Sequence, residues 1–151
     1  MEDLSLHILD IVENSITACA KKIEIKIIEE KKKDLLTIEI IDDGKGMDEG
    51  ALKNVLDPFF TTRNTRKVGL GLPLLAQSAE ESRGSIKIES KPGQGTKVKA
   101  TFGYSHIDRR PLGDIYESLK VLIVANPDIN FIYEYQKNDV NYHLDTKGIK
   151  K

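Results

Sequence analysis

The spacing of apolar residues along the first hundred positions predicts an ordered series of short helices and strands. Apolar residues recur every three or four positions in segments that we interpret as helices: 4–20, 48–56 and 71–83. Apolar and polar residues alternate in segments that we interpret as strands: 23–27, 36–40, 84–90 and 95–102. The order of these segments predicts an α+β fold, a two-layer sandwich of a mostly antiparallel sheet with helices on one face.

Two of the predicted helices have a well-defined apolar face. In segment 4–20 this face is predicted to contain Leu9, Val12, Ile16 and Ala20. The opposite, polar face carries Asp10, Glu13, Asn14 and Thr17. In segment 71–83 the apolar face is predicted to contain Leu72, Leu75, Ala76 and Ala79. Pro73 is compatible with this helix only if the helix begins at Pro73 or just before it.

The character of the chain changes at about Tyr104, which divides it into residues 1–103 and 104–151. A polar linker is followed by a predicted helix at 114–125 and by two predicted strands, 129–136 and 140–146, that pair across a turn. Six of the nine aromatic residues lie here: Tyr104, Tyr116, Phe131, Tyr133, Tyr135 and Tyr142. Aromatic residues are favoured in interface cores, but they also pack domains together. The second part therefore either packs on the first or presents a binding surface.

Length, charge and composition argue against nucleic-acid-binding, membrane-bound and secreted proteins. The 151 residues suffice for one domain with a hydrophobic core. A net charge of −1 removes the main argument for a nucleic-acid or membrane-surface partner. No apolar stretch reaches the roughly 18 residues of a membrane span, and the N-terminus lacks a signal-peptide pattern, so we expect a cytoplasmic protein. Cys19 is the only cysteine, and we expect it to be a small buried side chain.

The stretch IDDGKGM, residues 41–47, follows a predicted strand and is the first candidate for chemistry. Asp-Gly is common in turns, so a plain turn is one interpretation. In the other, the carboxylate of Asp42 accepts a hydrogen bond from an exocyclic amine, while Gly44 and Gly46 let a ring approach the backbone. Such a pocket would suit adenine.

Other segments carry compatible groups. Asp10 and Asn14 share one helix face, where an amide oxygen can bind Mg²⁺ and a carboxylate can orient an attacking group. VGLGLPLL places a Gly-X-Gly at a helix N-terminus, which favours phosphate. DPFFTTRNTRK has the composition of a lid, and PGQGT is a turn near Thr96. Each of these segments alone is equally typical of a polar helix face, an exposed loop or a hairpin.

In this order the segments resemble the ATP-binding fold shared by histidine kinases, type II topoisomerase ATPase domains, MutL-type repair proteins and Hsp90. LDIVENSITAC is similar to the N box of that superfamily, IDDGKGM to its first glycine box and DPFFTTR to its F box. VGLGLPLL is similar to the second glycine box, and PGQGT to the glycine turn before the last strand. The resemblance covers residues 4–102 and implies the two-layer Bergerat fold.

The resemblance also implies a binding site for ATP and Mg²⁺. It places Mg²⁺ on Asn14 and the adenine amine on Asp42, and it gives Asp10 the catalytic role of orienting the acceptor or a water. Histidine kinases often carry Asn at the position of Asp10, whereas hydrolytic and serine-kinase relatives tend to carry Glu. The remaining implied nucleotide contacts are Thr17, Gly44, Gly46, Met47, Phe60, Thr62, Arg63, Gly69, Leu70, Gly71, Leu72 and Thr96.

Within the superfamily, PFFTT followed by GLGL is most similar to the catalytic domain of histidine kinases. No dimerisation helix with a phospho-acceptor histidine precedes the N box, and His7, His106 and His143 lack the setting of an acceptor or of a zinc site. We therefore expect an ATP-dependent kinase for signal transduction, such as a two-component system, with weak ATPase activity. It would phosphorylate a histidine or serine of a separate protein.

Two other functions remain as alternatives. One is a nucleotide-gated protein-binding module in the manner of anti-sigma factors. The other, an ATPase clamp, is disfavoured because such relatives add a transducer domain and only 49 residues follow Phe102. The oligomeric state, including a homodimer, is left open.

Overall fold

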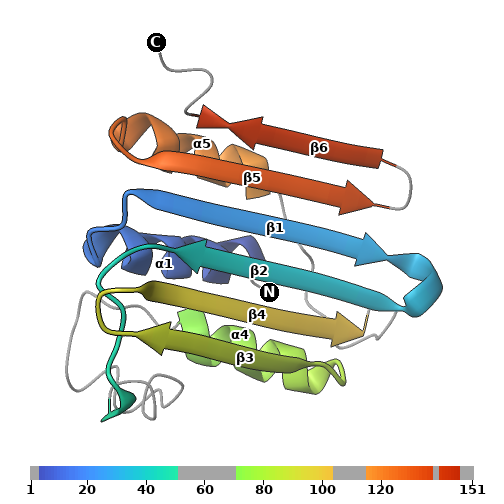
Figure 1. Ribbon diagram of the computed structural model, residues 1–151. Helices are drawn as coiled ribbons and strands as arrows, with labels where there is room; N and C mark the ends of the chain where they lie inside the picture. Colours follow the sequence, from blue (N-terminus) through green and yellow to red (C-terminus); the bar gives the residue numbers. More distant parts are fainter. Residues whose placement is uncertain (1–3, 51–70, 104–114, 138–139, 147–151) are drawn as a thin grey trace.

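The computed structural model describes residues 4–50, 71–103, 115–137 and 140–146 and arranges them in two layers (Figure 1). One layer is a six-stranded sheet with the strand order β3-β4-β2-β1-β5-β6. Its strands are β1 (Lys22–Glu30), β2 (Leu35–Asp42), β3 (Ser85–Lys91), β4 (Gly95–Gly103), β5 (Asn130–Lys137) and β6 (Val140–Asp145). A 3₁₀ turn, η1 (Lys31–Lys33), links β1 to β2.

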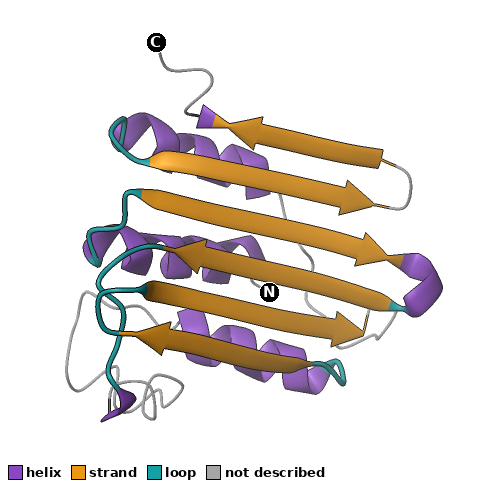
Figure 2. Cartoon of the chain, viewed as in Figure 1, coloured by secondary structure: helices purple, strands orange, loops and turns teal. Residues whose placement is uncertain are grey.

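The other layer consists of helices that cover one face of the sheet (Figure 2). They are α1 (Leu4–Thr17), α4 (Gly71–Glu81) and α5 (Ile115–Ala125). Neighbouring strands pair antiparallel except β1 and β5, which are parallel. The predicted α+β sandwich, with a mostly antiparallel sheet and helices on one face, is confirmed. The helix predicted at 48–56 extends into residues outside the described part of the chain.

Apolar residues at alternate strand positions place the hydrophobic core between the sheet and the helices. In β1 every second residue from Ile23 to Ile27 is fully buried, and the same holds in β2 from Leu36 to Ile40. Leu75 and Ala79 of α4 pack into this core, as predicted from their helical spacing. The other sheet face carries charged pairs such as Lys99 and Glu39, whose side-chain atoms lie 4.0 Å apart. Burial of alternate apolar residues therefore fixes which face of each strand meets the helices.

The predicted apolar face of α1 is displaced in the structure. The buried positions of α1 are His7, Ile8, Ile11, Val12 and Ser15, whereas the predicted Leu9 and Ile16 are only partly buried. A serine thus occupies one position of the buried stripe. The prediction placed Ser15 outside the apolar face because serine is polar. A polar side chain can nevertheless occupy a core position when it has a hydrogen-bond partner there.

Both α1 and α4 end earlier than predicted. At the end of α1 the N–H of Ala20 bonds to the carbonyl of Ser15 and the N–H of Cys19 to that of Ile16. Cys19 itself has a positive φ of 65°. This is a Schellman motif, which satisfies the last carbonyls of a helix. The same pattern ends α4, with Arg83 at φ 65°.

The exposure of Cys19 corrects the expectation that its side chain is buried. In the Schellman motif Cys19 occupies the position after the helix, where the chain turns away from the core.

Residues 115–146 contribute to the same sheet and the same core. β5 pairs in parallel with β1 over its whole length, so that Phe131 lies opposite Ile23. Phe131 and Leu119 are each 1% exposed and belong to the cluster formed by α1 and the central strands. β6 pairs antiparallel with β5, as predicted from the sequence. The aromatic residues of β5 therefore contribute to the fold itself.

Candidate functional site

A cavity of about 160 Å³ lies between α1 and the ends of β2 and β4. Ile40 and Val98 form its apolar floor on the sheet. α1 provides a wall made of Ile11, Asn14, Ser15 and Ala18. The other lining residues end β2, follow it or begin β4: Asp42, Gly46, Met47 and Thr96. Flat apolar walls with one carboxylate at the edge suit a purine ring that carries an amino group.

Asp42 is held in place by two hydrogen bonds. The hydroxyl of Ser15 donates to Oδ2 at 2.5 Å, and the backbone N–H of Gly44 donates to Oδ1 at 2.8 Å. A carboxylate accepts about four hydrogen bonds, so both oxygens keep capacity for a ligand. The carboxylate is thus oriented by the protein and still able to accept a hydrogen bond from an amine.

The neighbouring Asp43 has a different, structural role. Its Oδ1 accepts the backbone N–H groups of Lys21 at 2.7 Å and of Lys22 at 2.9 Å. These bonds tie the end of β2 to the start of β1. Of the two consecutive aspartates, only Asp42 lines the cavity.

The glycines after Asp42 allow close packing of three backbone segments. Gly46 has a φ of +71°, and a Cβ at this position would lie 2.0 Å from the carbonyl oxygen of Lys91. A Cβ on Gly44 would lie 2.8 Å from the carbonyl oxygen of Ala18. A side chain is therefore excluded at Gly44, which lies against the end of α1, and at Gly46, which lies against the β3–β4 turn.

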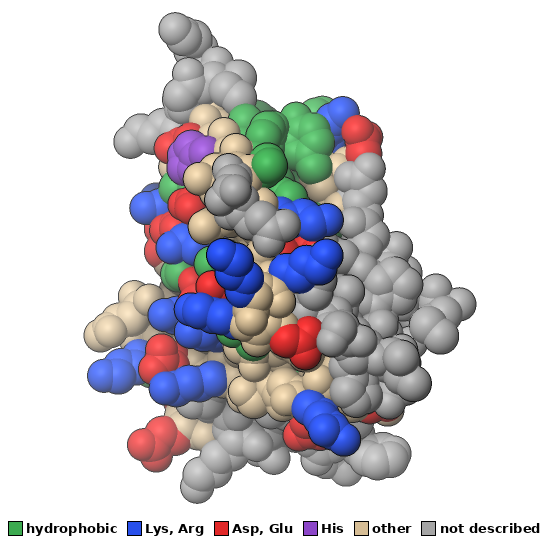
Figure 3. Space-filling view, turned by 90° about the vertical axis from the view of Figure 1, so that its right-hand side faces the viewer, with side chains coloured by type: hydrophobic (Ala, Val, Ile, Leu, Met, Phe, Trp, Pro, Cys, Tyr) green, Lys and Arg blue, Asp and Glu red, His purple; other side chains and the backbone are tan. Residues whose placement is uncertain are grey.

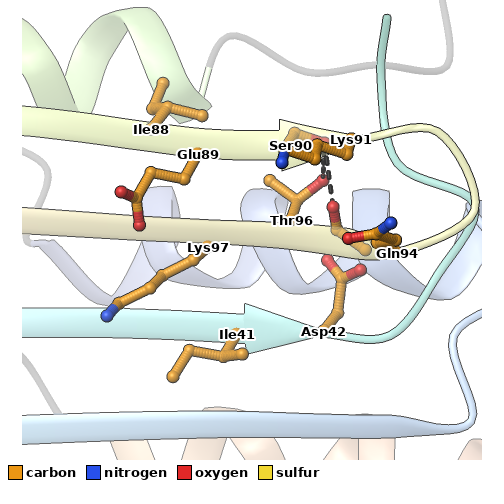
Figure 4. A pocket seen from close by; sticks show the side chains of 10 residues that line it. Ile41, Asp42, Ile88, Glu89, Ser90, Lys91, Gln94, Thr96 and Lys97 are labelled. Carbon is orange, nitrogen blue, oxygen red and sulfur yellow. Dashed lines mark hydrogen bonds between the residues drawn. The ribbon is translucent and has the colours of Figure 1, made fainter.

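Ser90, which the sequence analysis did not single out, joins this loop to β4. Its hydroxyl oxygen accepts the N–H of Met47 at 2.8 Å and donates to the carbonyl of Gly95 at 2.9 Å. It also lies 2.8 Å from the hydroxyl of Thr96, and Figure 4 shows these side chains at the adjoining ends of β3 and β4. Ser15 and Ser90 both occupy positions that face the helix–sheet interface. A serine at such a position, in register with apolar residues, is the signal in the sequence that could have identified them.

A larger depression of about 510 Å³ adjoins the cavity and shares Asp42 and Thr96 with it. Its other walls include Ile41, Glu89 and Lys97 (Figure 4). This depression is more open and has mixed charge. The smaller cavity is the better candidate for a base, because it has apolar walls and the oriented carboxylate.

The predicted site residues on α1 differ in their positions. Asn14 lines the cavity. Asp10, one turn earlier, is partly buried and Thr17 is exposed, and neither of these two residues lines the cavity. No cluster of three or more histidine, cysteine or acidic side chains that could hold a metal occurs in the described residues. A single amide oxygen suits Mg²⁺ that takes its other ligands from phosphates and water.

Several predicted nucleotide contacts fall outside the described residues. They are Phe60, Thr62, Arg63, Gly69 and Leu70. Gly71 and Leu72 open α4, consistent with the interpretation of VGLGLPLL as a helix start. Among the helices that the structure describes, none is long and apolar enough to cross a membrane.

Comparison with known proteins identifies the family. The model of the family described as "Histidine kinase-, DNA gyrase B-, and HSP90-like ATPase" matches residues 2–106. A putative sensor protein of Shewanella frigidimarina is 32% identical over 109 residues, which cover 71% of this chain and 17% of that protein. The sensor protein kinase FleS of Pseudomonas aeruginosa is 36% identical over 110 residues, covering 73% of this chain and 27% of the kinase. The chain thus spans less than a third of either relative.

Solved structures with the same fold match more of the chain. The N-terminal domain of a DNA repair protein has a TM-score of 0.64 at 17% identity, covering 96% of this chain and 53% of that one. The ADP-bound MutL ATPase domain of Aquifex aeolicus has a TM-score of 0.54 at 18% identity, covering 91% and 61%. The shared fold therefore extends beyond residue 106 into α5 and the β5–β6 hairpin.

Sequence and fold agree on the kind of domain. The family binds ATP, and the curated relatives named above are a sensor protein and a sensor kinase. The chain belongs to the histidine kinase-, DNA gyrase B- and HSP90-like ATPase family and is a histidine-kinase-like ATP-binding domain.

Proposed function

We propose that this chain binds Mg²⁺-ATP and transfers the γ-phosphoryl group to a histidine or serine on a separate protein in signal transduction. The observation that carries the proposal is the carboxylate of Asp42, oriented by Ser15 and Gly44 at the edge of an apolar cavity. The proposal is further supported by the similarity to a sensor protein and a sensor kinase, and by the match of the family model to residues 2–106, which include this cavity.

Adenine binds in the cavity between α1 and the sheet. Its exocyclic amine donates to Asp42, and the ring lies on Ile40 and Val98. Adenine carries this amine at C6, where guanine carries a carbonyl oxygen that cannot donate, so a hydrogen bond from the 6-amine to Asp42 favours ATP over GTP. Asn14 would hold Mg²⁺ through its amide oxygen, which would supply neutralisation of the phosphate charge.

The transfer step needs little covalent chemistry from the protein. The acceptor nitrogen or oxygen forms a bond to the γ-phosphorus while the bond from that phosphorus to the β–γ bridging oxygen breaks, and ADP leaves. Asp10, on the helix that carries Asn14, orients the acceptor, whose proton passes to this carboxylate. Water in place of the acceptor gives slow ATP hydrolysis.

The described histidines support an acceptor outside this chain. His7 is buried in α1, and His143 lies in β6, where its Nδ1 is 3.8 Å from Oε1 of Glu134. Neither lines the cavity. His106 lies outside the described residues.

The proposal is tested by phosphoryl transfer from γ-labelled ATP into proteins of the source organism's lysate. The parent protein should label a discrete acceptor, whereas Asp42→Asn should label it far less at the same ATP concentration. Acid-labile label identifies phosphohistidine, and acid-stable label identifies phosphoserine. If ATP binds but no protein is labelled above the Asp42→Asn control, the kinase proposal is wrong and the nucleotide-gated binding module is favoured.

A further inference from the structure

The two edges of the sheet differ in chemistry. The β3 edge carries charged residues at alternate positions: Lys87, Glu89 and Lys91. The β6 edge reads VNYHLD and contains no lysine, arginine, proline or glycine. Edge strands are usually protected from pairing by such residues, lysine above all. In the part of the chain that the structure describes, no strand pairs with the outer edge of β6.

The exposed apolar side chains of the described residues gather beside this unprotected edge. On α5, Val121 is 70% exposed and Val124 is 80% exposed; on β6, Val140 is 64% exposed and Tyr142 is 42% exposed. Figure 3 shows hydrophobic side chains together at the end of the molecule formed by α5 and β6, whereas charged side chains predominate over the rest of the described surface in view. An exposed apolar patch of this kind typically marks a protein–protein interface.

We propose that the β6 edge and the exposed face of α5 form the interface of a homodimer, in which β6 pairs antiparallel with β6 of a second copy. The two sheets then join into one continuous sheet, and the α5 helices of both copies lie on the same face. Such an interface is isologous, because the same residues meet across a two-fold axis.

The sequence of β6 fits a two-fold axis. Residues that are directly opposite in an antiparallel pair point to the same sheet face, so only registers that preserve the alternation are allowed. A register centred on Tyr142 places Val140 opposite Leu144 of the second copy on the helix side. On the open side it places Asn141 opposite His143 of the second copy. No like charges meet in this register.

The apolar residues of α5 supply the area that a strand pair lacks. A stable interface buries roughly 800 Å² on each partner, more than six paired residues provide. Val121 and Val124 add exposed apolar surface on α5, the helix whose Tyr116 ring lies 5.7 Å from that of Tyr142 in β6. The nearby charges Glu117 and Lys120 pair with each other at 3.1 Å, which leaves no net charge to repel a second copy. α5 also contacts α1, so the interface is connected to the helix that lines the cavity.

The first test is the mass of the full chain in solution over a range of concentrations, by sedimentation or light scattering. We expect a dimer that dissociates on dilution. Val140→Lys should raise the dissociation constant at least tenfold, because a lysine would be placed in the shared strand pair. Ser85→Lys on the β3 edge is the matched control and should leave the constant unchanged.

The second test fixes the register by disulfide formation in a Cys19→Ser background. Tyr142→Cys should crosslink two copies under mild oxidation, since paired positions across an antiparallel axis lie at about 5 Å between Cα atoms, within disulfide range. Ser85→Cys should not crosslink. A protein that is monomeric at all concentrations overturns the proposal and leaves the β6 edge to an extended peptide of another protein. A dimer that is insensitive to Val140→Lys and does not crosslink at Tyr142 overturns it as well.

Discussion

The hydroxyl of Ser15 on α1 donates a hydrogen bond of 2.5 Å to Oδ2 of Asp42 at the end of β2. This bond joins the helix layer to the sheet at the edge of the candidate adenine cavity. Ser15 is 3% exposed, so its hydroxyl is withdrawn from solvent and finds its partners within the protein. The structure therefore gives Ser15 a role in orienting the carboxylate that we propose to recognise adenine.

Ser15→Ala removes this hydrogen bond without adding volume. We expect ATP to bind about three- to tenfold more weakly, because an oriented carboxylate loses a bond of about 1 kcal/mol and gains rotational freedom. Titration calorimetry measures the affinity. Ser82→Ala is the matched control: Ser82 is also fully buried, but its hydroxyl donates to Ala79 at the end of α4. Equal affinity losses in the two variants would contradict the orienting role.

Asp42→Asn and Asp43→Asn separate recognition from structure. Asp42→Asn should weaken ATP binding by roughly ten- to a hundredfold, the cost of one hydrogen bond to a charged group of about 1.5 to 3 kcal/mol. Asp43→Asn should instead lower the free energy of unfolding, because a neutral amide oxygen replaces the charged oxygen that accepts the N–H groups of Lys21 and Lys22. Calorimetry and urea unfolding are measured for both variants. An Asp42→Asn protein that is folded and binds ATP with the parent affinity would disprove the adenine assignment.

Asn14→Ala should abolish the effect of Mg²⁺ on the nucleotide site. The parent protein is expected to bind ATP more tightly with Mg²⁺ than with a chelator, since the amide oxygen of Asn14 can bind a phosphate-associated ion. In Asn14→Ala the two affinities should converge, and phosphoryl transfer should be lost. Glu13→Ala, at the exposed neighbouring position, is the control. A variant that keeps the full Mg²⁺ effect would refute the role of Asn14.

Gly46→Ala and Gly93→Ala distinguish close packing from backbone strain. Both glycines have a positive φ, +71° and +77°, but an added Cβ would lie 2.0 Å from the Lys91 carbonyl oxygen at Gly46 and in open space at Gly93. Gly93→Ala should cost only the left-handed strain of about 1 to 2 kcal/mol. Gly46→Ala should cost clearly more in urea unfolding and should also weaken ATP binding. Similar costs for the two variants would rule out the close packing at Gly46.

Phe131→Ala tests whether residues 115–146 are part of the cooperative fold. Phe131 is 1% exposed between β5 and the helices, so its removal should lower the free energy of unfolding by about 3 to 5 kcal/mol. Glu80→Ala, at an exposed position of α4 outside the proposed interface, should change it by less than about 0.5 kcal/mol. Unfolding should remain a single transition in both variants. A separate transition for the C-terminal part would mean that it folds as a unit of its own.

Local sequence patterns were sufficient to predict most of the described helices and strands and the candidate chemistry at their ends. Alternation in segments such as 36–40 identifies a strand because side chains on a strand point to opposite faces in turn. The sequence also shows Asp42, Gly44 and Gly46 close after this predicted buried strand. These are local properties, and a pattern within a few residues is sufficient to predict them. The helix ends were missed because the residues with positive φ are Cys19 and Arg83, where glycine is the usual signal.

Contacts between residues far apart in the sequence could not be predicted in this way. The faces of β1 and β5 follow from alternation, but their parallel pairing joins residues more than a hundred positions apart, such as Ile23 and Phe131. In the same way Asp42 and Asp43 look equivalent in sequence and differ only through their distant partners, Ser15 for one and the backbone of Lys21 and Lys22 for the other. Local periodicity sets the direction of a side chain, whereas its partner depends on strand order and register, which the whole core selects.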